Sequence, residues 1–344
     1  MLTLNIDHYR TLRALRLSIA LIVTYGITWY FQIPEGTWAA ITCCVVLYEY
    51  TTLGGVLNKS YLRILGTIHA AMYGCIILYV FANDVYVNLL ALIAGVFINA
   101  YLFMDTSRSY SSTLGCITLV LVLLNYHHLH DLDAAVLRPF NILLGEAVAI
   151  TVMSCVFPEY ARDSAIICQN RLTQDLISLM KIFLVQPFSV EEFKKQYFFL
   201  EKKILSDITE CNRYVDEARM EVRNTKVIID FFSQSIEHFS RVFHLLNAFF
   251  HYVNTSKNDV VGEISDSFAI VLSHLLNLSD VIQDPAKKIE KFSQNLLCKE
   301  ENDPSSLMHQ ALLQSMKEEL KGLETTWENI SVLRLNKFKK NRTI

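Results

Sequence analysis

The sequence predicts an all-α protein, in which a bundle of six membrane-spanning helices precedes a helical domain in the cytoplasm. Hydrophobic residues make up 52% of the 344 residues, and charged residues only 19%. The charges are divided unevenly, because residues 1–158 hold seven Lys or Arg and eight Asp or Glu, against 24 and 26 in the remainder. Apolar residues also recur at helical spacing after the charge-poor part. We therefore expect a transmembrane domain over residues 1–158 and a soluble domain over residues 159–344.

Six apolar stretches approach the roughly 20 residues that a helix needs to cross a bilayer. They cover residues 15–33, 38–53, 62–82, 85–104, 109–126 and 136–157. Cations collect in the loops on one side of these stretches, at Arg10, Arg13, Arg16, Lys59, Arg63, Arg108 and Arg162. Arg138 is the exception. Because cytoplasmic loops carry the excess of Lys and Arg, both termini are predicted to be cytoplasmic.

Small residues mark the third stretch as a packing helix. Residues 54–74 read GGVLNKSYLRILGTIHAAMYG, in which Asn58, Lys59 and Ser60 form a short polar connection before the span. Gly66, Ala70 and Gly74 share one helix face, where neighbouring backbones can approach closely in lipid. The residues predicted to pack between helices are Gly54, Gly55, Gly66, Thr67, Ala70, Gly74 and Gly145.

This string, with its arginine and Gly-Thr pair, resembles the fusaric acid resistance and aromatic acid exporter family, to which the aluminium-activated malate transporters of plants are distantly similar. Three further segments share the resemblance, namely Pro34-x-x-x-Trp38-Ala39-x-x-Thr42, Arg138 followed by Gly145, and Phe157-Pro158. It covers about the first 160 residues. His69 stands where the family often has glycine. The resemblance implies a bacterial inner-membrane exporter of small organic anions, such as aromatic carboxylates.

Ionisable residues within the spans are the candidate site residues, because charge at membrane depth is costly. Arg63 and Arg138 would bind an anionic substrate, since guanidinium pairs with a carboxylate at any working pH; alternatively they anchor the bundle at the two interfaces. Glu49 and Glu146 would couple protons, or remain neutral and hydrogen-bonded between helices. His69 would join the substrate site, or serve only in packing.

Other chemistries find little support. The run His127-His128-x-His130-Asp131-x-Asp133 is either a metal site or a solvated extracytoplasmic loop, and no metal is predicted. The eight scattered cysteines suggest no disulfide framework. The net charge of −3 argues against nucleic acid as a partner. No phosphate-binding loop or nucleophile–base constellation occurs, so we expect neither a cofactor nor an enzyme.

The soluble half has an unusually regular apolar spacing of alternating three and four residues from Ile204 to Phe250. Such spacing is typical of a coiled-coil seam. It predicts either one helix over about residues 190–253, which we favour, or a hairpin that turns near residues 223–225.

Together these features predict a proton-coupled efflux transporter of organic anions, embedded in the lipid bilayer as a homodimer with or without a periplasmic adaptor protein. A passive anion channel and a non-transporting scaffold that binds a partner through its cytoplasmic helices are the alternatives. Flux measurements distinguish them, because only the pump moves anions against a gradient.

Overall fold

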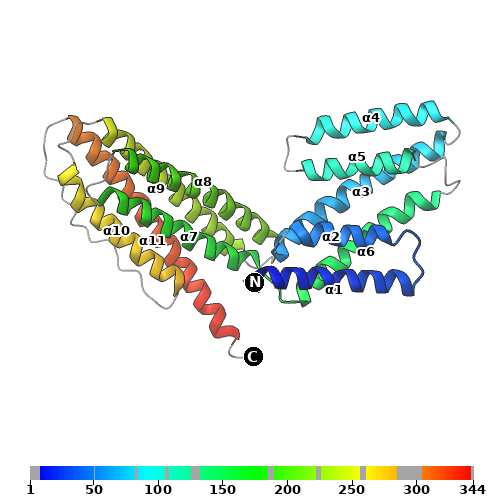
Figure 1. Cartoon of the computed structure of the whole chain (residues 1–344), viewed down its shortest axis with the longest axis horizontal. Coiled ribbons are helices and arrows are strands. Elements are labelled where there is room, and N and C mark those ends of the chain that lie inside the picture. Colours follow the sequence, from blue (N-terminus) through cyan, green and yellow to red (C-terminus); the bar gives the residue numbers. More distant parts are fainter. Residues whose placement is uncertain are drawn as a thin grey trace, which may run out of the picture. The chain divides into compact units, whose positions relative to one another are not determined.

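The computed structural model describes residues 8–49, 51–81, 84–104, 108–124, 132–184, 190–221, 226–255, 261–284 and 304–341. Within these ranges all regular secondary structure is helical, as predicted. The chain divides into two compact units, Met1–Tyr160 and Ala161–Ile344 (Figure 1). The first unit contains α1 to α6, and the second contains α7 to α11.

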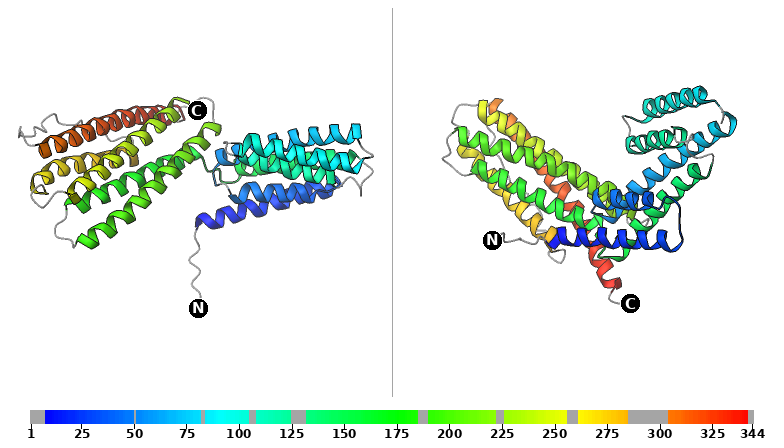
Figure 2. Two further views of the ribbon diagram at one scale, coloured as in Figure 1. Left: turned by 90° about the horizontal axis from the view of Figure 1, so that it is seen from above. Right: turned by 45° about the vertical axis from the view of Figure 1, so that its right-hand side comes forward.

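Helices form at all six of the apolar stretches in the first unit, and successive helices run in alternating directions (Figures 1 and 2). Among the described residues, α1, α3, α4 and α6 are long and apolar enough to cross a membrane, whereas α2 and α5 are shorter. The 13 residues of α2 extend only about 20 Å, against a hydrocarbon core of about 30 Å. The bounds are α1 (His8–Tyr30), α2 (Thr37–Glu49), α3 (Leu53–Phe81), α4 (Val85–Phe103), α5 (Ser109–Leu124) and α6 (Leu132–Cys155).

The six helices form two groups of three. Helices α1, α2 and α6 surround one apolar core, α3, α4 and α5 surround another, and α3 packs against α6. The residues predicted to pack between helices are all buried. A Cβ atom at Gly66 would lie 2.1 Å from the carbonyl oxygen of Ser111 in α5, and one at Gly145 would lie 2.4 Å from that of Ala39 in α2. Helix α3 therefore approaches α5 closely at Gly66, and α6 approaches α2 closely at Gly145.

The start of α3 corrects the prediction for the polar connection before it. The helix begins at Leu53, and the hydroxyl of Thr52 accepts a hydrogen bond from the N–H of Gly55 at 3.1 Å, as an N-terminal cap does. Lys59 and Ser60 are consequently helical and buried. Their polarity suggested a loop, but it belongs to the interior of the bundle.

Arg16 joins α1 to the end of α6. Its Nε donates to the carbonyl oxygen of Val156 at 3.0 Å, and its Nη2 lies 3.0 Å from the Glu159 carboxylate and also donates to the Phe157 carbonyl. These bonds satisfy carbonyls that a helix end leaves without intrahelical partners. The N–H of Leu53 donates to the Glu159 carbonyl at 2.8 Å, so the start of α3 is fixed at the same place.

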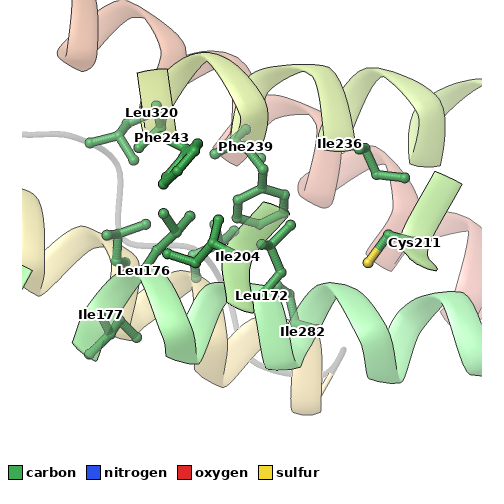
Figure 3. Close-up of a cluster of buried hydrophobic side chains, with 14 of the residues drawn as sticks. Leu172, Leu176, Ile177, Ile204, Cys211, Ile236, Phe239, Phe243, Ile282 and Leu320 are labelled. Atoms are coloured by element: carbon green, nitrogen blue, oxygen red, sulfur yellow. The ribbon is translucent and has the colours of Figure 1, made fainter. Parts of the chain in front are cut away.

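The second unit is a helical bundle built around one large apolar core. Leu172 and Leu176 of α7, Ile204 of α8 and Phe239 and Phe243 of α9 converge there (Figure 3). The helices are α7 (Ala161–Leu184), α8 (Val190–Glu221), α9 (Lys226–Thr255), α10 (Val261–Gln283) and α11 (Pro304–Asn341).

The preference for one continuous helix over residues 190–253 is wrong. Helix α8 ends at Glu221, α9 begins at Lys226, and the predicted turn lies outside the described residues. The two helices pack antiparallel, because Tyr197 near the start of α8 stacks on Phe250 near the end of α9, with ring centroids 3.6 Å apart. Regular spacing predicts an apolar face, but not whether another molecule or the same chain covers it.

Two cysteines also depart from the prediction of no disulfide framework. Cys168 of α7 and Cys211 of α8 are joined as a disulfide, with Cα atoms 5.6 Å apart. Both are buried in the core of the second unit. They lie 43 residues apart in the chain, so only the pairing of α7 with α8 brings them together.

Candidate functional site

A buried ion pair joins three helices in the first unit. Nε of Arg63 in α3 lies 3.5 Å from Oε1 of Glu146 in α6, and Nη2 of Arg63 donates to Oγ1 of Thr42 in α2 at 3.1 Å. The side chains of Arg63 and Glu146 are 7% and 1% exposed. The structure thus brings together one predicted anion-binding residue and one predicted proton-coupling residue.

Glycine packing explains why this pair forms. Gly145 precedes Glu146 and lets α6 approach the backbone of α2 at Ala39, one turn before Thr42. The carboxylate of Glu146 therefore enters the space between α2 and α3. The motifs that predicted close packing place the charged groups as well.

The hydrogen-bonding capacity of the pair is not filled. Apart from the hydroxyl of Ser60, which interacts with Glu146, the described residues donate no hydrogen bond to its carboxylate oxygens, and the Nε of Arg63 donates none to them. Buried polar groups without partners are costly, and sites that bind a proton, water or a polar ligand commonly carry them. Glu146 can therefore accept a proton, and Arg63 can accept a second anionic partner.

Lys59 lies one helical turn before Arg63 and is a residue that the sequence indicated only as a topology signal. It is 2% exposed, forms an ion pair with Glu49, and lies over the ring of Tyr110 at 4.7 Å from the centroid. The signal that could have identified it is the spacing of four residues between Lys59 and Arg63, which places both cations on one face of a helix. Glu49 itself is 57% exposed at the end of α2, so it is not at the depth that the sequence predicted.

Arg138 occupies the opposite end of the unit. Its Nε lies 3.3 Å from the Glu35 carboxylate, its guanidinium lies 5.2 Å from the centroid of the Trp38 ring, and its buried Nη1 donates to none of the described residues. Eight residues of α6 separate it from Glu146, which is about 12 Å along the helix axis. The structure therefore does not bring Arg138 and Arg63 together around one carboxylate.

His69 also lies apart from the ion pair. Its side chain is exposed on the outside of the unit, and its Nδ1 is 2.8 Å from the carbonyl oxygen of Leu65 in its own helix. The predicted role of His69 in substrate binding has no support from this geometry.

Metal ligation was an open alternative for the run of residues 127–133. The histidines of that run lie outside the described residues. No group of three or more His, Cys, Asp or Glu suited to a metal ion occurs in the part of the chain that the structure describes.

Comparison with known proteins agrees with the apolar helices. The model of the fusaric acid resistance protein family matches residues 10–339. The inner membrane protein YeeA of Escherichia coli is 27% identical over 154 residues, which are 45% of this chain and 43% of that protein. The match therefore spans less than half the length of this curated relative. These findings, and the four helices of spanning length found among the described residues, identify a membrane protein.

Proposed function

We propose, because the chain belongs to the fusaric acid resistance protein family, that it exports small organic anions across the bacterial inner membrane in a proton-coupled reaction. The single observation that carries this proposal is the buried Arg63–Glu146 pair with its unfilled hydrogen-bonding positions. Aromatic and aliphatic monocarboxylates are the cargo class that best suits one guanidinium.

The chemistry follows from the cost of burying charge. Arg63 stays protonated, so the buried site needs one anion beside it. Glu146 supplies that anion when the site is empty. When a carboxylate cargo occupies Arg63, a second negative charge nearby is strongly unfavourable, and Glu146 takes up a proton. One proton therefore accompanies each monovalent anion, and both leave the site when Glu146 pairs with Arg63 again. Because an inside-alkaline pH difference favours movement in the opposite direction, export by this cycle is driven by an excess of the anion in the cytoplasm.

Calorimetry with benzoate and propionate tests this exchange on the purified full chain. Titrations at pH 7 in two buffers of different ionisation enthalpy measure how many protons are taken up with each anion. We expect about one proton per benzoate for the unmodified chain, none for Glu146→Gln, and no saturable binding for Arg63→Gln. Binding without proton uptake, or equal binding by Arg63→Gln, would contradict the proposed exchange.

Flux measurements separate the carrier from a passive anion channel. In liposomes containing the protein, benzoate flux through a channel follows an imposed membrane potential, because net charge moves. Flux of an anion together with a proton follows the pH difference and ignores the potential. Protein-free liposomes and the Arg63→Gln variant correct for benzoic acid that crosses the lipid unaided. A scaffold would show no protein-dependent flux under either condition.

The predicted homodimer loses one of its arguments. A coiled-coil seam could pair with a second chain, but Phe232, Phe239 and Phe243 on this seam are fully buried within the second unit. Dimerisation and a periplasmic adaptor remain predictions. Their test is the mass of the detergent-solubilised complex.

A further inference from the structure

Helices α3 and α6 carry equivalent residues at equivalent positions. The seventh residue of each helix is a cation, Lys59 in α3 and Arg138 in α6. The fourteenth residue of each is a glycine, Gly66 and Gly145, that packs against a neighbouring backbone. Arg138 therefore lies 79 residues after Lys59, and Gly145 lies 79 residues after Gly66.

The partners of these residues correspond in the same way. Lys59 lies over Tyr110, the second residue of α5, and Arg138 lies over Trp38, the second residue of α2. Gly66 packs against the carbonyl of the third residue of α5, and Gly145 against that of the third residue of α2. Tyr110 lies 72 residues after Trp38, and Ser111 lies 72 residues after Ala39, so one separation relates both kinds of partner.

The correspondence extends to whole helices. Exchanging α1, α2 and α3 for α4, α5 and α6 converts the contact of α1 with α2 into that of α4 with α5. In the same way, the contact of α2 with α6 corresponds to that of α5 with α3, and the contact of α1 with α6 corresponds to that of α4 with α3. The contact of α3 with α6 is unchanged by the exchange. The second helix of each set is the short one. Three helices are an odd number, so the two sets run in opposite directions (Figures 1 and 2).

The exchange places the site between the two copies. Glu146 and Thr67 each follow the packing glycine, and both are buried where α3 meets α6. The position equivalent to Arg63 is Ile142, and the position equivalent to Glu146 is Thr67, so each set of three helices contributes one of the two central charges. In transporters built from inverted repeats, substrate sites lie at the repeat interface, and opening alternates between the two ends.

We propose that the first unit is an inverted repeat whose two cation–aromatic contacts are equivalent gates. Lys59 with Tyr110 closes the end that holds the starts of α3 and α5, and Arg138 with Trp38 closes the end that holds the starts of α2 and α6. Both contacts are formed in this structure, and the Arg63–Glu146 pair is buried, so this is the state closed at both ends. Because cytoplasmic loops carry the excess of Lys and Arg, the gate formed by Lys59 and Tyr110 is assigned to the cytoplasmic side. The proposal rests on the proposed transport function, but its test measures solvent access rather than flux, so the two can fail separately.

A cysteine at the repeat interface reports which gate is open. The reporter is Thr67→Cys in a full chain whose other free cysteines in this unit, Cys43, Cys44, Cys75, Cys116 and Cys155, are replaced by serine. A membrane-impermeant, charged methanethiosulfonate is applied to one side of right-side-out and inside-out membrane vesicles. The rate of labelling at the reporter is measured by mass spectrometry.

We expect Tyr110→Ala to raise labelling from the cytoplasmic side about tenfold, and Trp38→Ala to raise it about tenfold from the other side. Tyr110→Phe and Trp38→Phe keep a ring and should label like the parent. Tyr79→Ala, at an exposed aromatic residue near the end of α3, controls for general loosening. Three results would overturn the proposal. They are a rise from the same side in both alanine variants, a rise from both sides in one variant, and no rise in any variant.

Discussion

At the scale of single residues, burial decides what each charge can do. Arg63 and Lys59 both seemed from the sequence to lie near a membrane boundary, yet each is buried against an acidic side chain. Removing one member of a buried pair leaves the other charge without compensation. That loss is usually larger than the loss on removing both.

This principle gives a prediction for the central pair. Arg63→Met alone should destabilise the protein by about 3 kcal/mol, because it strands the carboxylate of Glu146. The double variant Arg63→Met with Glu146→Leu should recover much of that loss. Thermal unfolding in detergent at pH 7 measures both. Additive losses in the double variant would show that the two side chains do not interact.

A second residue-scale prediction concerns the contact of α9 with α11. Burial raises the pKa of Glu319, but hydrogen bonds from His238 at 2.6 Å and Arg241 at 3.2 Å more than offset it and hold the pKa below its ordinary value of 4.5. The folded state therefore favours the ionised carboxylate. The stability that this provides is present above pH 4.5 and is lost as the pH falls through the lower folded pKa.

The fluorescence of Trp327 reports this loss, because its indole is buried beside Phe232 and donates to Ser235 at 2.9 Å. Trp29 and Trp38 are first replaced by Phe, so that Trp327 is the reporter. On acid titration this chain should expose Trp327 at a higher pH than the same chain carrying Glu319→Gln. Each transition is corrected for the stability of that chain at pH 7. Glu318→Gln, at an exposed neighbour, should behave as the parent. Identical acid transitions in all three chains would contradict the prediction.

At the scale of elements, close backbone approach determines which helices pair. Gly145 is followed by Glu146 of the ion pair, and Gly66 is followed by Thr67, which is the equivalent position in α3. Helix packing and the geometry of the site therefore depend on the same contacts. A side chain at either glycine has to displace a backbone carbonyl of the neighbouring helix. Backbone yields less readily than a flexible side chain.

Alanine at these positions should therefore destabilise the first unit. Gly66→Ala and Gly145→Ala should each cost about 1–3 kcal/mol, as overpacking does. Gly26→Ala is the matched control, because nothing lies within 4 Å of its added Cβ and alanine is favoured by up to about 1 kcal/mol within a helix. Thermal unfolding in detergent should rank Gly26→Ala at or above the parent. Equal midpoints for all three variants would contradict this account.

The second unit shows where element-scale prediction from sequence fails. The apolar positions of α8 and α9 were identified correctly, and Ile204, Phe239 and Phe250 among them are buried. The break between α8 and α9 was not predicted as the favoured alternative, because the spacing of apolar residues continues unchanged past the turn and no Gly or Pro marks it. The pairing of Cys168 with Cys211 was missed for a related reason, since it depends on which helices become neighbours.

At the scale of the whole molecule, the cation distribution predicts how the chain enters the membrane. If α1 to α6 make an even number of crossings, the chain end after α11 is cytoplasmic. A green fluorescent protein fused after residue 344 should then fluoresce, and alkaline phosphatase fused there should be inactive. Alkaline phosphatase fused after Leu124, at the end of α5, should be active. The reverse pattern would overturn the predicted orientation and the assignment of the two gates to their sides.

The sequence by itself determined the helical class, the six apolar segments, the family and the residues that bring helices close together. These properties are local, since each follows from composition, spacing or a short motif. Only the tertiary structure decided that Arg63 faces Glu146 while Arg138 faces Trp38, that His69 lies outside, and that the long seam folds back on itself. Those outcomes depend on which distant segments meet, and a periodic pattern fixes the face of a helix without fixing its neighbour.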